Sequence, residues 1–134
     1  MIVVDSSALL AILLSEPESG AVLDRMEAAS GLLLSVANFV EAAQVSAQRH
    51  ATPTEGIARF QALIDRVSIV LAPIDEVQAH EALRARIEYG RGFGHPAKLN
   101  YSDCFAYALA KTRALPLLFI GDDFTHTDIV SALP

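Results

Sequence analysis

The chain has little cysteine: its 134 residues include only one, Cys104. A single thiol excludes an internal disulfide framework and a zinc site built from several cysteines. Glycine and proline are also sparse, with seven and six residues, whereas 52% of the residues are hydrophobic. These numbers exclude collagen-like and disordered chains. The length predicts a single domain over residues 1–134, because most domains have about 100–150 residues.

The chain also lacks a long hydrophobic run. No apolar stretch approaches the ~20 residues that a membrane-spanning helix needs. The apolar run 8–14 follows Asp5 and has no Lys or Arg before it, so it lacks the basic start of a signal peptide. Together with the single cysteine, which suits a reducing compartment, this pattern predicts a cytoplasmic protein without a membrane segment.

An overall excess of positive charge is absent, because the net charge is −6. The basic residues are nevertheless concentrated: residues 84–113 contain six Lys and Arg side chains against two acidic ones, a local balance of +4. In an otherwise acidic chain, such a segment is either a surface that contacts phosphates or an ordinary solvated helix and loop. The charge pattern alone does not choose between the two.

Short apolar runs alternate with longer helical patterns along the chain. Strands are predicted at 2–4, 32–34, 68–72 and 117–120, and helices at 6–14, 16–29, 36–50, 55–67, 75–89 and 102–113, followed by a short terminal helix. The helix 102–113 is apolar almost all round, which predicts a buried central position. In the helix 36–50, Val36, Phe39 and Val40 predict one apolar face. The glycine-rich segment 90–100 predicts a loop.

The order of these elements predicts how the strands pair. Parallel strands need a crossover of about a dozen residues or more, and here helices separate the strands. The predicted fold class is therefore α/β, with a small parallel sheet of four or five strands and helices on both faces. In such folds the functional crevice lies at the carboxyl ends of the strands.

Acidic residues occur where that crevice is expected. Asp5 directly follows the strand 2–4, and Asp122 and Asp123 follow the strand 117–120, so these acids meet if the strands are neighbours. Glu41 and Asp103 lie in otherwise apolar helical segments. An unpaired carboxylate is costly to bury, so acids in such places need a partner or a shared purpose.

Each acid also has a local interpretation. Asp5 can cap the first helix, Glu41 can face water, Asp103 can form a capping box with Asn100, and the two later acids can occupy a turn. The alternative is one shared site. A carboxylate cluster without His or Cys suits hard cations such as Mg²⁺ or Mn²⁺. Beside a basic segment, it indicates metal-assisted hydrolysis of a phosphodiester.

At these residues the sequence resembles PIN-domain ribonucleases, specifically the VapC-type toxins of bacterial toxin–antitoxin pairs. The segments that carry the resemblance are Met1–Leu10, Ser35–Glu41, His95–Ala110 and Phe119–Ile129. They occur in the order and at the spacings of that family, over nearly the whole chain. Ser102 stands where many relatives have glycine, a small change that leaves the acids in place.

The resemblance implies a PIN-like fold and an endoribonuclease that depends on Mg²⁺ or Mn²⁺, is controlled by a cognate antitoxin and is commonly a homodimer. It assigns the metal-binding and catalytic roles to Asp5 and Asp103 as principal ligands, Glu41 as third acid and Asp122 as fourth, with Asp123 as an alternate or supporting acid. It further implies that Ser7 and Asn38 support these acids by hydrogen bonds.

The resemblance leaves the basic segment open between two partners. Arg84, Arg86, Arg91 and Lys98 are expected to contact either the RNA substrate or the antitoxin. His95 is expected to be a structural residue of the loop. Cys104, next to Asp103, is expected to be a small core residue, because nothing near it in sequence lowers the pKa of its thiol.

Three other functions fit parts of the same pattern. A PIN-like module could bind RNA or a protein without cutting, although all the acids are retained. A phosphatase with an aspartyl nucleophile also has an acid after its first strand, but its usual second acid would fall at Ser7. A phospho-receiver domain needs a Lys at a strand end, where neither Lys98 nor Lys111 is predicted.

Overall fold

The strands form one parallel sheet of four strands in the order β3-β2-β1-β4. The computed structural model describes residues 1–134. Its elements are β1 Ile2–Val4, α1 Ser6–Leu13, α2 Ser19–Ala28, β2 Leu32–Ser35, α3 Val36–Arg49, α4 Pro53–Val67, β3 Val70–Ala72, α5 Glu76–Tyr89, α6 Asp103–Arg113 and β4 Leu117–Leu118. No helix is long and apolar enough to cross a membrane. The predicted α/β class is confirmed.

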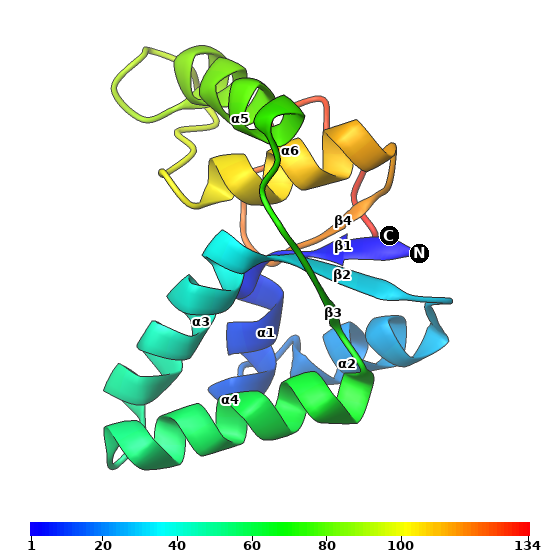
Figure 1. Cartoon of the computed structure of the whole chain (residues 1–134), viewed down its shortest axis with the longest axis vertical. Helices are drawn as coiled ribbons and strands as arrows, with labels where there is room; N and C mark the ends of the chain where they lie inside the picture. The colour runs from blue at the N-terminus through cyan, green and yellow to red at the C-terminus, as the bar shows by residue number, and fades with distance from the viewer.

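The sheet separates two layers of helices. Figure 1 shows α1–α4 on one side of the sheet and α5 and α6 on the other. Ile2 and Val4 of β1 lie in the apolar core under α1–α4, whereas Val3 lies in the core under α5 and α6. Successive strand residues point to opposite faces, so a strand covered on both faces must be apolar throughout.

Polar residues begin two helices at the carboxyl ends of strands. The side chain of Asp5, which follows β1, accepts the backbone N–H of Ser7 and caps α1. The side chain of Ser35, the last residue of β2, accepts the backbone N–H of Ala37 and caps α3. These caps satisfy N–H groups that a helix start leaves free. They also place the first turns of both helices at the edge of the sheet where the site is predicted.

Helix α6 is central and buried, as the sequence predicts. Its Tyr107 is fully buried; the hydroxyl donates to Asp128 Oδ1 at 2.6 Å and accepts from Arg84 Nη2 at 2.9 Å. Lys111 Nζ also donates to Asp128, at 2.8 Å. These contacts tie the segment after β4 to α5 and α6.

The predicted terminal helix is absent. Residues 121–134 form turns instead, and Ser131 bridges to Leu117. The backbone explains the difference, because Leu117 donates to Val130 O and accepts from Ala132 N, which commits this segment to the edge of β4. β4 accordingly ends at Leu118, before the predicted residue 120.

Two other boundaries differ from the prediction because the chain takes left-handed turns after helices. Ser15 has a φ of 53° after α1, and α2 begins at Ser19 rather than at residue 16. Ser68 has a φ of 54° and ends α4, so β3 begins at Val70 rather than at residue 68. Both are shifts of two or three residues that leave the order of the elements unchanged.

The buried face of α3 is not the predicted one. Val40 is 62% exposed, and the fully buried residues of this helix are Asn38, Ala42 and Ser46. Ser46 Oγ donates to Gly56 O at 2.8 Å, which satisfies the polar group inside the α3–α4 contact. A Cβ at Gly56 would lie 2.2 Å from Ser46 O, so the small residue permits this close approach.

Candidate active site

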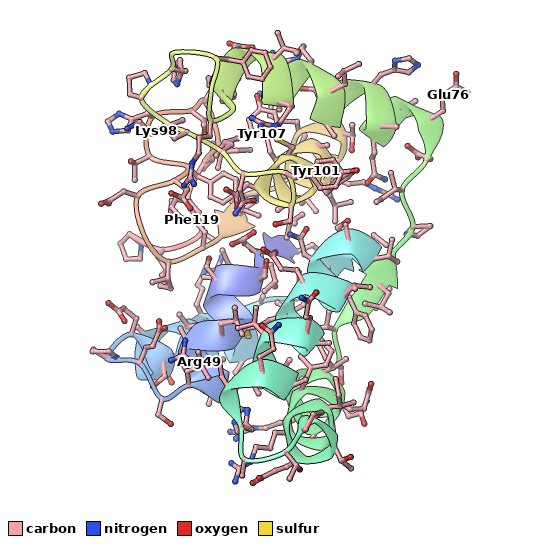
Figure 2. The ribbon with its side chains drawn as sticks, turned by 90° about the vertical axis from the view of Figure 1, so that its left-hand side faces the viewer. Arg49, Glu76, Lys98, Tyr101, Tyr107 and Phe119 are labelled. Carbon is pink, nitrogen blue, oxygen red and sulfur yellow. The ribbon has the colours of Figure 1, made fainter.

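The predicted acids gather where β1, α3 and α6 meet. Asp5 follows β1, the central pair partner of β2 and β4; Glu41 lies in the second turn of α3; Asp103 is the first residue of α6. In Figure 2 the beginning of α6, marked by Tyr101, lies near the beginnings of α1 and α3. The edge of the sheet that carries the carboxyl ends of the strands therefore brings these acids together.

Asp5 is a buried carboxylate with one oxygen engaged. The residue is 3% exposed, and its Oδ2 accepts from Ser7 N at 3.0 Å and from Ser7 Oγ at 2.5 Å. Its Oδ1 is buried without a hydrogen-bond partner. Burial raises the pKa of Asp5 to about 6, the hydrogen bonds from Ser7 lower it, and the charge of Glu41 raises it. The free oxygen is available to a ligand.

Ser7 connects two segments of the site. Its Oγ donates to Asp5 and accepts from Ile120 N at 3.1 Å. The same hydroxyl thereby fixes the Asp5 carboxylate and anchors the chain just before Gly121. Ser7 makes the kind of supporting hydrogen bond that the sequence analysis expects of it.

Glu41 is held by a residue that the sequence analysis missed. Ser6 Oγ donates to Glu41 Oε2 in a short hydrogen bond. Asn38 Nδ2 contacts the same Ser6 Oγ at 3.4 Å and donates to Ser102 O at 3.1 Å, which links α1, α3 and α6. The buried Asn38 Oδ1 has no partner. In sequence, Ser6 carries only the ordinary signal of a helix start.

Asp103 has a local role and a place in the cluster. Its Oδ2 accepts from Asn100 N at 2.9 Å, and its own N–H donates to Asn100 Oδ1 at 2.8 Å, so the expected capping box exists. The side chain is also buried, with the residue 6% exposed. Burial, and then the charge of Asp5, raise the pKa of Asp103 to about 7; Asp123 and Glu41 add to the rise, and the bond from Asn100 opposes it.

The cluster has no basic counter-charge. The ion pairs of the chain involve other acids: Glu55, Glu27, Glu76, Glu81, Glu88 and Asp128. Nearby like charges and burial both disfavour ionised carboxylates, which is why the pKa values of Asp5 and Asp103 rise. Perturbed carboxylates that face one another without a cation of the protein mark a functional site rather than a structural ion-pair network.

The two acids after β4 differ in their surroundings. Both are exposed, and the carbonyl of Asp122 accepts from Thr125 N at 3.1 Å and from Thr125 Oγ1 at 2.7 Å, as in the turn that the sequence also allows. Asp123 is the one whose charge raises the pKa of Asp103. Electrostatics therefore connects Asp123 more directly than Asp122 to the buried acids.

The chemistry of the donors suits a hard cation. No group of three or more His, Cys, Asp or Glu side chains is arranged to surround an ion by itself. Mg²⁺ does not require such a cage, because it usually keeps several waters and binds through one or two carboxylates and substrate phosphates. The unpartnered Oδ1 of Asp5 and the neighbouring carboxylate of Asp103 match that requirement.

The predicted basic surface divides into structural and free residues. Arg84 pairs with Glu81 at 2.6 Å and bonds Tyr107, and Arg86 donates to Arg91 O at 2.9 Å and Leu99 O at 3.4 Å. The side chains of Arg91 and Lys98 are exposed and form no ion pair. Only the latter two are free to contact a partner.

Cys104 is buried, as expected of a core residue. Burial raises the pKa of its thiol to about 11, with a further rise from the charge of Asp103 and a lowering by Arg86. A thiol with a raised pKa is a poor nucleophile at neutral pH. The chemistry of the site is therefore left to the carboxylates.

Comparison with known proteins agrees with this geometry. The family model described as PIN domain matches residues 2–130. The ribonuclease VapC42 of Mycobacterium tuberculosis is 41% identical over 128 residues, which cover 95% of each chain.

Two solved structures from the same organism share the fold. VapC20, described as a toxin that cleaves the sarcin–ricin loop, superposes with a TM-score of 0.79 at 12% identity over 100% of both chains. A member of the VapBC family of toxin–antitoxin systems, VapBC-5, gives a TM-score of 0.65 at 25% identity over 99% of this chain and 94% of that one. The resemblance seen in the sequence is thereby confirmed, and the chain belongs to the PIN domain family.

Proposed function

We propose that this chain is a metal-dependent endoribonuclease that acts as the toxin of a toxin–antitoxin pair in the cytoplasm. The observation that carries the proposal is the buried Asp5, whose Oδ1 has no partner and which lies among acids without any basic counter-charge. The relationship to ribonucleases named VapC, at 41% identity over almost the whole chain, supports RNA as the substrate.

In this proposal Asp5 and Asp103 hold Mg²⁺ or Mn²⁺, and Glu41 completes the buried acids. Asp122 and Asp123 supply the fourth carboxylate, and the effect on Asp103 favours Asp123. A bound cation lowers the pKa of water and offsets negative charge that develops on a phosphate. The hydroxyl of Ser7 fixes the orientation of Asp5, as outer hydrogen bonds commonly do for metal ligands.

Ser6 and Asn38 have a supporting role in the same proposal. Ser6 holds Glu41, and Asn38 holds Ser6 while bonding the backbone of Ser102, the residue before Asp103. The three acids from separate helices are thus tied together before any ligand arrives. Such preorganisation reduces the cost of assembling a charged site.

The first prediction concerns metal removal. Purified protein is expected to cleave RNA in Mg²⁺ or Mn²⁺ and to lose that activity in excess chelator. Ca²⁺ is expected to support cleavage poorly, because its larger and looser coordination shell positions water less well. Gel analysis of total RNA measures this directly. Undiminished cleavage in chelator would contradict the metal requirement, and binding of RNA without any cleavage would favour the non-catalytic module.

The second prediction concerns the antitoxin. VapBC-5 is a member of a toxin–antitoxin family, which supports a protein partner for this chain. We expect the antitoxin to place an Arg against Asp5 and Asp103, because a guanidinium matches paired carboxylates and would exclude a metal. The apparent affinity of the antitoxin should therefore fall as Mn²⁺ is added. An inhibited complex whose affinity is independent of Mn²⁺ would contradict this arrangement.

The third prediction is a homodimer. The helices that the sequence favours for association carry large exposed apolar residues only at Val40 and Ile57, whereas α5 alone exposes Val77, Leu83 and Ile87. We therefore place the proposed interface on α5. Stable interfaces bury roughly 1,200–2,000 Å². Light scattering should give a dimer mass for the wild type and a monomer mass for Leu83→Glu, and a monomeric wild type would refute the interface.

A further inference from the structure

The loop between α5 and α6, residues 90–100, has a fixed shape without being a helix or strand. Gly90 and Leu99 form a parallel bridge, and Arg91 N donates to Leu99 O at 2.9 Å. Arg86 of α5 donates to two carbonyls of the loop, those of Arg91 and Leu99. The base of the loop is therefore closed, and the groups that it presents are held in place before a ligand binds.

This loop surrounds a polar hollow of about 620 Å³. The hollow is lined by Arg91, Gly92, Gly94, His95, Pro96 and Lys98, none of them a hydrophobic residue. Arg91 and Lys98 have no carboxylate partner, unlike Arg84 in the neighbouring helix. Two unpaired cations around a space without apolar walls fit an anionic chain better than an apolar protein segment.

Two further side chains give the loop a recognition surface. His95 Nδ1 accepts from Ala97 N at 3.1 Å, so the proton of the neutral ring is on Nε2, which is left as a donor. Phe93 is 52% exposed, with the guanidinium of Arg86 lying 5.4 Å from the ring centroid. Arg86 thus supports the ring, and the exposed part of Phe93 is available for stacking.

The loop leads directly into the site. Its last residue, Asn100, forms the capping box with Asp103. Figure 2 shows Lys98 above Phe119, on the side of the molecule where the chain that follows β4 also runs. A ligand held in the loop would therefore lie beside the acids rather than on a separate face.

We propose that residues 90–100 form a subsite for single-stranded RNA next to the bond that is cut. Arg91 and Lys98 contact phosphates, Phe93 stacks on an unpaired base, and His95 Nε2 donates to the same strand. Cationic side chains combined with an exposed aromatic ring are the usual means of binding single strands. This inference rests on the proposed function and identifies the form of RNA that the site takes.

Binding of a fluorescent, unstructured oligoribonucleotide to Asp5→Asn protein, which should not cut it, tests the subsite. Arg91→Ala/Lys98→Ala should weaken binding and lower the slope of log affinity against log salt by about 1.4, or about 0.7 for each phosphate contact on a single strand. The matched control, Arg49→Ala/Arg113→Ala, removes two exposed cations from the last turns of α3 and α6. Figure 2 shows Arg49 toward the opposite end of the molecule from Lys98, and this control should keep the wild-type slope.

Phe93→Ala provides a second, independent readout. Loss of one stacked base should weaken binding at least about fivefold and leave the salt slope unchanged. Binding of a duplex RNA should be insensitive to this substitution, because its bases are already stacked on one another. Thermal melts of each variant verify that the fold is intact.

The outcomes separate this inference from the proposed function. If wild type cleaves RNA but the loop variants bind it as the control does, the subsite is wrong and the nuclease assignment stands. If the loop variants keep RNA binding and lose the antitoxin, the loop serves the protein partner and the RNA subsite is also wrong. If wild type neither binds nor cleaves RNA with metal present, the proposed function and the subsite fall together.

Discussion

Asp5→Asn is expected to abolish RNA cleavage while leaving the metal-free fold at least as stable as the wild type. Asn caps a helix about as well as Asp, and its side-chain oxygen can still accept from Ser7. The substitution removes one charge from a buried site that also holds Glu41 and Asp103. We expect the free energy of unfolding without metal to stay the same or rise by about 0.5–2 kcal/mol, within the usual span of single substitutions.

Added Mn²⁺ should reverse that order. Wild type gains RT ln(1 + [L]/Kd) from binding, about 2.7 kcal/mol when the metal is at a hundredfold excess over Kd. Asp5→Asn should gain much less, and its cleavage rate should fall by orders of magnitude. Thermal melts with and without Mn²⁺, beside a cleavage assay, measure both effects.

Asp75→Asn is the matched control for this experiment. Asp75 also caps a helix, α5, by accepting from Gln78 N at 2.8 Å, and it lies outside the acid cluster. Its substitution should leave cleavage and the response to Mn²⁺ unchanged. Early melting of Asp5→Asn without metal would mean that Asp5 is chiefly structural. Wild-type cleavage by Asp5→Asn would mean that it is not a ligand.

The second large effect is a loss of metal-free stability as pH rises. The folded-state pKa values of Asp5 and Asp103, about 6 and about 7, both exceed the ordinary value of 3.8. The unfolded chain therefore releases these protons at lower pH than the folded chain does. Between about pH 4 and pH 7 the unfolded state binds fewer protons, so the free energy of unfolding falls, on the order of a few kcal/mol in total.

Asp128 has the opposite sign and a different pH window. The hydrogen bonds from Lys111 and Tyr107 lower its pKa, so its contribution is present above the ordinary value and is lost as pH falls below it. The decline above pH 4 therefore reports on the buried acids. Urea unfolding in chelator at several pH values measures it, and Asp5→Asn/Asp103→Asn should flatten the curve. A wild-type curve that is flat or rises from pH 4 to pH 7 would contradict the raised pKa values.

Local sequence patterns were sufficient to predict the sheet. The apolar runs of β1 and β2 and the helices between successive strands follow from residue properties that act over a few positions. The place of Asp5 at the end of β1 follows in the same way. Boundaries were less accurate where the backbone of another segment decides them, as at β4, whose edge is occupied by residues 130–132.

The buried face of α3 shows what sequence periodicity omits. Val40 is more apolar than Asn38, so the pattern favours burial of Val40. In the structure Asn38 is buried because Ser6 and Ser102, far away in the chain, supply its hydrogen-bond partners. A buried polar residue needs such partners, and they are not visible in the local sequence. The bond from Ser6 to Glu41 was missed for the same reason.

The local and shared interpretations of the acids proved compatible. Asp5 uses Oδ2 to cap α1 and keeps Oδ1 free of partners. Asp103 forms its capping box with Asn100 and still responds to the charges of Asp5, Glu41 and Asp123. Capping explains why these acids occur at helix starts, and the convergence of three helices explains why they share one site.

The most direct test of the central claim is the single-turnover rate of RNA cleavage by wild type, Asp5→Asn and Asp103→Asn at one saturating Mn²⁺ concentration. We predict that wild type cleaves and that each variant is slower by orders of magnitude, while Asp75→Asn keeps the wild-type rate. Equal rates for wild type and both site variants, or no cleavage by wild type with metal present, would contradict the assignment of these acids as a metal-dependent ribonuclease site.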